Sequence, residues 1–446
     1  MNDFLFFILA KVFAFLSSQP IGSRMKRYTD NDFIKNLTNR ISSDGLDSKI
    51  YSDVVDSDGN QYVDLVQEGG GLFGIALLGY TYVLERANIR FFSLAGTSAG
   101  AINSMMMAAL SKVGEPVSLR TLDMLTGKDL SELVDGDQRV WNFIRRYMQN
   151  GIRMYPRIFL NLPRAIKSIR RELGLNPGME FEKWISSHLT SNGIHTLYDL
   201  EHHRSMLPKL VDRNSGKRIK KKPQLKLITS DVTSKSKITF PDMAELYWHN
   251  PNEVNPALFV RASISIPFFF MPMIVNNIPG AGSYEDTELP KNKTRWRKHT
   301  GYRGKIPETV HFVDGGMLSN FPIHAFHQKG VPLKPTFGAR LSTWRTEAYP
   351  IEGFQAFCNA MVGTMRQLHD YDFLLQHPDY KHLICSIDCD AQLDEQGRKR
   401  FNYLDFEMEE SIKIKLFQHG AQKAFDFLTK FNWEKYKQIR EEMVGF

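Results

Sequence analysis

Residues 62–110 read YVDLVQEGGGLFGIALLGYTYVLERANIRFFSLAGTSAGAINSMMMAAL, and this stretch decides the fold. Its apolar runs and glycine-rich turns predict a strand, a glycine loop, a helix, a second strand, a sharp turn and a second helix. The first strand stops at Glu68, and the second ends just before Gly96. Consecutive strands of such a unit are usually parallel neighbours, so both turns are expected at the carboxyl edge of one sheet.

The two turns carry complementary chemistry. Residues 96–100 have the G-x-S-x-G pattern of a nucleophile elbow, in which Gly96 and Gly100 let the Ser98 hydroxyl project from a tight turn before a helix. Backbone N–H groups of the glycine loop can hold an oxyanion that forms on the substrate of this serine. The candidate donors are Gly69, Gly70, Gly71 and Leu72. A flexible turn is the alternative interpretation of three consecutive glycines.

A third block, DGGMLSNFP, follows a short predicted strand at Thr309–Val313. It begins with Asp314, and Gly315 and Gly316 come directly after it. Because Asp314 ends a strand, we expect it at the carboxyl edge of the sheet, close enough to bond Ser98. Partial burial would favour its protonated form and raise its pKa, which suits a general base. A turn-initiating aspartate before two glycines is the alternative.

In this order, EGGGLFG, GTSAG and DGGMLSNFP resemble the signature blocks of the patatin-like phospholipases. RASISIPFFFMP, from Arg261 to Pro272, and LKLITSDVTSKSKITFP, from Leu225, are similar to other stretches of that family. The resemblance covers about residues 60–345. It implies a Ser-Asp dyad without a catalytic histidine, and phospholipids or related glycerolipids as substrates. One departure is Phe73, where the family's glycine loop usually has arginine or lysine.

Two rival functions remain open. One is a triad esterase or acyltransferase, because His324 and His419 follow Ser98 and Asp314 in the order Ser, Asp, His. His311 fits this role less well, since strand alternation points it away from the face of Asp314. The other rival is a non-catalytic lipid-binding or partner-binding module on the same fold.

The composition describes a globular chain with ample core. Of its 446 residues, 42 % are hydrophobic and 24 % charged, and the mean hydropathy of −0.33 argues against an integral membrane protein. The net charge of +8 favours an anionic partner, either nucleic acid or an acidic membrane surface. With the resemblance, we expect the membrane surface and no nucleic acid.

Cysteine usage favours a reducing compartment, because Cys358, Cys385 and Cys389 are too few for a disulfide framework. No histidine or second cysteine pair lies near them at zinc spacing, so we predict no metal site, and the proposed chemistry needs no cofactor. A cytoplasmic or peripheral-membrane location follows as an expectation. The oligomeric state is not indicated.

The first 27 residues contain an apolar segment, Phe4–Leu16, that is too short to span a bilayer. It fits either an interfacial anchor or a helix docked on the core. A cleaved signal or a membrane anchor is a further alternative, although Asp3 and Lys11 interrupt the usual pattern. Residues 28–60 are polar and turn-rich, and they lead into the catalytic domain predicted at 61–345.

Helical spacing dominates residues 119–222, which predicts a helical cap inserted in the catalytic domain. The cap mixes cations and aromatic residues, which suits contact with a membrane surface or a solvated helix face. These residues are Trp141, Phe143, Arg145, Arg146, Tyr147, Arg153, Tyr155, Arg157, Phe159, Arg164, Lys167, Arg170 and Arg171. The basic run 217–222 is interpreted as a charged hairpin loop, and the basic connection 276–307 as a flexible loop or a second head-group contact.

Residues 346–446 are predicted to be mostly helical and packed on the core. The segment Phe354–Leu375 has a stripe of Phe357, Met361, Met365 and Leu368, which we interpret as core. A long amphipathic helix is expected from about Glu409. Altogether, we predict a three-layer α/β/α fold with a largely parallel central sheet.

Overall fold

The computed structural model describes residues 21–137, 162–284, 295–345, 348, 350–391 and 407–444. Within these ranges one sheet contains ten strands. They are β1 (Val54–Val55), β2 (Gln61–Gln67), β3 (Ile89–Thr97), β5 (Val211–Asp212), β6 (Leu225–Asp231), β7 (Ser236–Phe240), β9 (Met273–Asn276), β10 (Thr309–Asp314), β11 (Thr336–Arg340) and β12 (Ile384–Ser386). A separate parallel pair joins β4 (Gly174–Asn176) to β8 (Phe268–Phe270).

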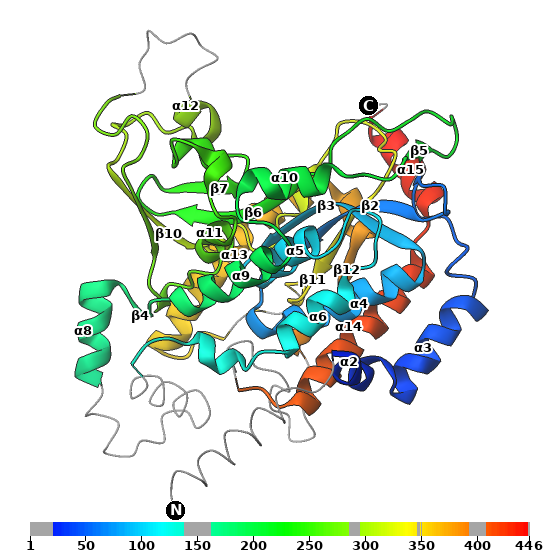
Figure 1. The fold of residues 1–446 in the computed structure, drawn as a ribbon, viewed down its shortest axis with the longest axis horizontal. Coiled ribbons are helices and arrows are strands. Elements are labelled where there is room, and N and C mark those ends of the chain that lie inside the picture. Colours follow the sequence, from blue (N-terminus) through cyan, green and yellow to red (C-terminus); the bar gives the residue numbers. More distant parts are fainter. Residues whose placement is uncertain are drawn as a thin grey trace, which may run out of the picture.

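Helices lie on both sides of the large sheet (Figure 1). The α-helices of the described ranges are α2 (Ile21–Thr29), α3 (Asp32–Ser43), α4 (Gly74–Arg86), α5 (Ala99–Ala109), α6 (Ser118–Thr126), α8 (Leu162–Glu172), α9 (Met179–Ser191), α10 (Leu197–Ser205), α11 (Ala257–Ser263), α12 (Arg295–Thr300), α13 (Phe354–Gln376), α14 (Glu410–Lys430) and α15 (Trp433–Val444). Short 3₁₀ turns near the sheet edge are η1 (Gly71–Phe73), η2 (Leu130–Leu133), η6 (Gly315–Met317) and η7 (Ile323–Phe326). None of these helices is long and apolar enough to traverse a bilayer.

The central strands β12-β11-β2-β3-β6 run parallel in this order, and β7, β9 and β10 add antiparallel pairs. This confirms the predicted α/β fold with a largely parallel sheet between helices. All residues of β2 are buried, as expected for a parallel strand covered on both faces. The predicted order of elements across residues 62–110 is confirmed as β2, η1, α4, β3 and α5.

One edge of β6 pairs with two different strands. Its first half pairs in parallel with β3, where Ile228 lies opposite Thr97. Its second half pairs with the antiparallel β10, where Thr229 lies opposite Asp314. Because Ile228 and Thr229 are consecutive, the ends of β3 and β10 meet head to head. Asp314 therefore reaches the carboxyl edge of the parallel strands from the opposite direction, on a strand that runs against them.

Residues 119–222 are mainly helical where they are described, and they also contain the short strands β4 and β5. The predicted basic and aromatic positions 141–159 lie outside the described residues, as do the apolar segment Phe4–Leu16 and residues 285–294 of the basic connection 276–307. An antiparallel bridge between Val211 and Arg218 closes a hairpin whose turn lies at residues 213–216. The basic run therefore begins on the returning arm of this hairpin and not in its loop, because Lys217 and Ile219 pair with Asp212 and Leu210.

The interpretation of the apolar stripe on α13 as core was wrong. Phe357, Met361, Met365 and Leu368 have exposed fractions between 45 % and 57 %. The opposite side of α13 packs on the protein through Asp370 and Leu374, which are buried. An apolar stripe identifies one side of a helix, and it does not specify whether the domain itself covers that side. In contrast, α14 is buried through Leu416, Ala421, Ala424 and Leu428, as predicted.

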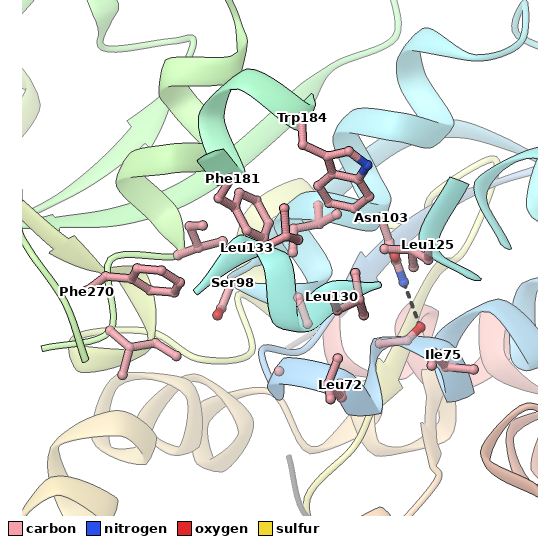
Figure 2. A pocket seen from close by; sticks show the side chains of 16 residues that line it. Leu72, Ile75, Ser98, Asn103, Leu125, Leu130, Leu133, Phe181, Trp184 and Phe270 are labelled. Atoms are coloured by element: carbon pink, nitrogen blue, oxygen red, sulfur yellow. Dashed lines mark hydrogen bonds between the residues drawn. The ribbon is translucent and has the colours of Figure 1, made fainter. Parts of the chain in front are cut away.

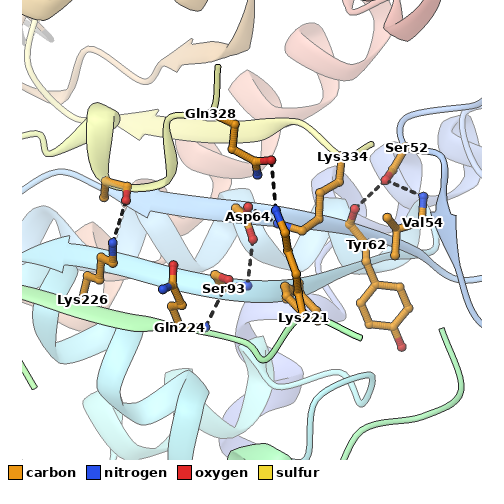
Figure 3. Close-up of polar contacts among 12 residues, drawn as sticks. Ser52, Val54, Tyr62, Asp64, Ser93, Lys221, Gln224, Lys226, Gln328 and Lys334 are labelled. Atoms are coloured by element: carbon orange, nitrogen blue, oxygen red, sulfur yellow. Dashed lines mark hydrogen bonds and ion pairs between the residues drawn. The ribbon is translucent and has the colours of Figure 1, made fainter. Parts of the chain in front are cut away.

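A buried polar network joins β2 and β3 to the segments that precede β6 and β11 (Figure 3). The Asp64 carboxylate, in the middle of β2, pairs with the Lys334 ammonium and accepts the Ser93 backbone N–H at 3.1 Å. The side chains of Asp64 and Lys334 are only 3 % and 7 % exposed. The Ser93 hydroxyl continues the network by accepting the Gln224 N–H at 3.2 Å. The register of β2 against β3 shifts at this point, between Val63 and Leu65.

Replacing Lys334 with alanine should destabilise the protein by about 3–5 kcal/mol, because it leaves a buried carboxylate without its cation. The double variant Asp64→Asn/Lys334→Met should lose less stability than Lys334→Ala, since it removes both charges. Urea denaturation followed by circular dichroism measures both values. Equal losses in the single and double variants would contradict the role assigned to the pair.

Candidate functional site

Ser98 stands at the sharp turn between β3 and α5. Its φ of 52° and ψ of −116° lie in a region that non-glycine residues rarely adopt, at a cost of roughly 1–3 kcal/mol. The Ser98 backbone N–H donates to the Ser263 hydroxyl oxygen at 3.0 Å, and that hydroxyl donates to the Ile228 carbonyl at 2.6 Å. Ser263 therefore holds the strained turn against β6.

The two glycines of G-x-S-x-G are required by close packing. A Cβ on Gly96 would lie 2.2 Å from the Gly100 carbonyl oxygen, and a Cβ on Gly100 would lie 2.2 Å from the Gln67 carbonyl oxygen. Both distances are far shorter than a van der Waals contact. The start of α5 can cross β2 and β3 this closely only because these positions have no side chain, and the crossing fixes the direction of the Ser98 hydroxyl.

Asp314 lies at the end of β10 with its carboxyl group facing the Ser98 hydroxyl, which favours the ionised carboxylate. Its Oδ1 also accepts the Gly316 N–H at 2.6 Å, and its own N–H donates to the Ser265 carbonyl at 2.8 Å. Burial raises the pKa of Asp314, while the Arg366 guanidinium, the Ser98 hydroxyl and the Gly316 N–H oppose this shift less strongly. The structure thus brings together the two side chains that the sequence analysis selected from opposite halves of the chain.

The glycine loop lies beside this pair. The Gly69 N–H donates to the Asn320 carbonyl at 3.0 Å, so in this structure it is already engaged. Gly71 has a φ of +54° and begins η1 with Leu72. The first N–H groups of a helical turn have no acceptor within the turn. Gly70, Gly71 and Leu72 are therefore the better placed of the predicted oxyanion donors.

An apolar pocket opens at Ser98 (Figure 2). Phe181 and Trp184 of α9 lie on one side of Ser98, and Leu72 and Ile75 lie on the other. Further lining side chains are Ile102, Asn103, Leu125, Leu130, Leu133, Ile264, Ile266 and Phe270. Among the polar lining residues, Asn103 binds the Gly74 carbonyl through Nδ2 at 3.0 Å, which ties α5 to the start of α4. Apart from Ser98 and Asn103, the lining is mostly apolar, so the cavity provides an apolar environment next to the Ser98 hydroxyl.

Phe73, the departure in the glycine loop, is buried in the hydrophobic core and is not among the residues that line this pocket. Its backbone continues from η1 into α4 with ordinary helical angles. The replacement of a cation by phenylalanine thus adds core packing at this position and does not close the pocket.

Asn320 links the glycine loop to the loop that contains Asp314. Its Nδ2 donates to the Gly69 carbonyl at 3.0 Å and to Glu68 at 3.2 Å, and its Oδ1 accepts the Arg366 guanidinium at 2.9 Å. Asp370 holds the same loop by accepting the Ser319 hydroxyl at 2.6 Å and the Phe321 N–H at 2.7 Å. Arg366 and Asp370 both belong to α13, so this helix supports the loop of Asp314.

Arg261 fixes the segment between α11 and β9. Its guanidinium donates to the Ser265 hydroxyl at 2.5 Å, to the Pro177 carbonyl at 2.6 Å and to the Met271 carbonyl at 2.8 Å. Since the Ser265 carbonyl accepts the Asp314 N–H, this clamp positions the end of β10. The roles of Arg261, Ser263 and Ser265 were not predicted from the sequence, although the segment that begins at Arg261 resembles a stretch of the family. Buried polar residues within the apolar run ALFVRASISIPFFF were the available signal.

The described contacts of the candidate histidines lie elsewhere. The His324 ring meets the Lys237 ammonium at 2.9 Å, and His419 bonds the Ile387 carbonyl at 2.5 Å. The backbone of His311 bonds Thr233 and Val232. None of these histidines has a described hydrogen bond to Ser98 or Asp314. Among the described residues, no group of three His, Cys, Asp or Glu side chains is arranged to hold a metal ion.

Comparison with known proteins places the chain in a family. The family model "Patatin-like phospholipase" matches residues 65–327, which is more than half of the chain. The chain therefore belongs to the patatin-like phospholipases, and membership of this family supports lipid acyl hydrolase activity as its general function.

The individual relatives share low sequence identity with this chain. The chain is 29 % identical over 378 residues to the uncharacterized protein YqhO of Bacillus subtilis, a match that covers 83 % of this chain and all of YqhO. Among solved structures, it is similar to VipD from Legionella pneumophila, with a TM-score of 0.38, 13 % identity and coverage of 85 % of this chain and 70 % of VipD. The ExoU-SpcU complex from the type III secretion system of Pseudomonas aeruginosa gives a TM-score of 0.33 and 16 % identity, over 85 % of this chain and 52 % of that one.

Replacing Ser263 with alanine should cost about 1–3 kcal/mol of stability, because the buried Ser98 N–H and the Ile228 carbonyl both lose their partner. The exposed Ser205, whose hydroxyl bonds a carbonyl within its own helix, provides the matched control. Ser205→Ala should change stability by less than about 0.5 kcal/mol. If denaturant unfolding gives the same value for both variants, Ser263 does not hold the elbow.

Proposed function

We propose that this protein is a serine acyl hydrolase that cleaves fatty-acyl ester bonds of phospholipids or related glycerolipids through Ser98 and Asp314. The observation that carries the proposal is the meeting of these two buried side chains at the ends of β3 and β10, next to an apolar pocket that opens at Ser98. A nucleophile in contact with its base, next to space for an apolar chain, is what acyl transfer from a lipid requires.

The reaction begins when Ser98 Oγ attacks the ester carbonyl carbon and Asp314 accepts the hydroxyl proton. The carbonyl oxygen becomes an oxyanion, which the N–H groups of Gly70, Gly71 and Leu72 stabilise. The tetrahedral intermediate collapses, and Asp314 returns the proton to the departing alcohol oxygen. This leaves the acyl group on Ser98.

Water then completes the turnover. Asp314 removes a proton from a water molecule that attacks the acyl-serine carbonyl, and the same N–H groups hold the second oxyanion. When this intermediate collapses, the Ser98 oxygen leaves, takes back the proton and frees the fatty acid. One aspartate thus acts as base and acid in both halves of the reaction, and no histidine takes part. The described contacts of His324 and His419 favour this dyad over a triad.

Ser98→Ala and Asp314→Asn should each reduce the release of fatty acid from phospholipid vesicles by at least about 1,000-fold, because both remove a group that takes part in bond making. Product analysis by mass spectrometry measures the released acid. Ser191→Ala and Asp58→Asn, two exposed sites away from the pocket, serve as matched controls. Full activity in either dyad variant would show that the dyad is wrong.

The pH dependence follows from the pKa of Asp314, which burial raises above its ordinary value. The base acts as a carboxylate, so the rate should be full above this pKa and fall as the pH drops through it. Arg366 lowers the pKa, so Arg366→Gln should shift the acid limb of kcat/KM to higher pH, and Arg366→Lys should restore much of it. A soluble ester substrate gives the profile. If Arg366→Gln lowers kcat/KM without shifting the acid limb of the pH profile, Arg366 supports the loop of Asp314 but does not influence the pKa of its carboxyl group.

A further inference from the structure

Phe268 is an aromatic residue held in an unusual position beside the pocket. Its φ is +68°, a left-handed conformation that bulky residues rarely adopt, and its side chain is 65 % exposed. It lies between Ile266 and Phe270, which both line the pocket at Ser98. Backbone strain that turns a large apolar ring into solvent next to a site calls for a functional explanation.

Leu173 repeats this arrangement next to Phe268. Its φ is +61°, and its side chain is 49 % exposed. The next residue, Gly174, pairs with Phe268 where β4 and β8 run in parallel. Two exposed apolar side chains, each on a left-handed backbone, therefore lie next to one another, with Leu173 directly before β4 and Phe268 in β8 between two residues of the pocket lining.

Cations accompany these two residues. Lys167, Arg170 and Arg171 of α8 are exposed. Lys167 and Arg171 line a shallow cleft that also contains the carboxylates of Asp135, Asp137 and Glu172, whereas Arg170 is not part of its lining. The helix is fixed to β4, because the Leu173 N–H donates to the Ile169 carbonyl at 3.1 Å and the Ser168 hydroxyl donates to the Gly174 carbonyl at 2.9 Å. The nearby Asp135 is engaged as the cap of α9, where it accepts the Gly178 and Met179 N–H groups at 2.7 Å each.

We propose that Leu173, Phe268, Lys167, Arg170 and Arg171 form a docking patch that binds the surface of an anionic lipid bilayer and sets the pocket mouth against it. This inference rests on the proposed function, since a lipid substrate enters from a bilayer. Apolar side chains that enter the interface beside cations that meet the head groups are the chemistry of interfacial binding. The cations of α8 favour a bilayer surface that is anionic. Because Phe268 lies between two residues of the pocket lining, a patch at this position would hold the pocket mouth against the bilayer.

The test uses the full chain with Ser98→Ala, so that binding is measured without turnover. Flotation with phosphatidylcholine vesicles that contain phosphatidylserine should recover the protein, and pure phosphatidylcholine vesicles should recover much less. Arg170→Gln/Arg171→Gln should weaken binding to the anionic vesicles about fivefold per charge and reduce its dependence on salt. Lys220→Gln/Lys222→Gln removes an exposed basic pair outside the patch and serves as the control, which should bind anionic vesicles about as well as the parent protein.

The apolar half of the patch is tested by Leu173→Asn/Phe268→Asn, because asparagine accepts a left-handed backbone and removes the apolar side chain. This variant should weaken vesicle binding about tenfold while its melting temperature stays at least as high as that of the parent. Tyr198→Asn, which replaces an aromatic residue of 63 % exposure on α10, is the matched control.

Three results would overturn the proposal. The patch variants could bind as tightly as the parent protein, or Met361→Gln/Met365→Gln on α13 could abolish binding while the Leu173→Asn/Phe268→Asn variant retains it. Absence of binding to either vesicle would reassign the patch to an acidic protein partner. Fatty-acid release by the unmodified chain, measured separately, reports on the proposed function. Vesicle binding without release of fatty acid would contradict the proposed hydrolase function and would leave the docking patch supported.

Discussion

The site depends on the way β6 shares one edge between two strands. β3 arrives in parallel and ends opposite Ile228, and β10 arrives antiparallel and ends opposite Thr229. These two pairings bring together the ends of strands that lie more than two hundred positions apart in the chain. The close approach of the Ser98 hydroxyl and the Asp314 carboxyl group follows from this junction, and the remaining contacts hold its two ends in place.

Those contacts form a shell of buried polar groups around the junction. Ser263 joins the Ser98 turn to β6, the carbonyl of Ser265 holds Asp314, and Asn320 connects the glycine loop to α13. Such groups are costly to bury unless each is paired, so the shell also stabilises one arrangement of the loops over others. The strain at Ser98 is maintained by the same contacts.

The parts of the site that could be predicted from the sequence are those with a local signature. Glycines around Ser98 and after Asp314, each at the end of an apolar run, indicate a turn at a sheet edge without any knowledge of tertiary structure. Arg366 and Ser263 have no such signature, because their roles depend on which loops α13 and α11 meet. The prediction that the apolar stripe of α13 is buried was wrong for a related reason. Hydrophobic periodicity identifies the apolar face of a helix, but it does not specify which other element, if any, packs against that face. The antiparallel course of β10 was also hidden, because a short apolar strand looks the same in either direction.

The central claim is that Ser98 is a nucleophile activated by Asp314. A fluorophosphonate probe reacts covalently with such serines, and mass spectrometry of the digested protein identifies the labelled residue. We expect the label on Ser98, with the labelling rate strongly reduced in a folded Asp314→Asn protein. A folded protein that does not label at Ser98, or that labels at the same rate without the Asp314 carboxylate, would contradict the claim.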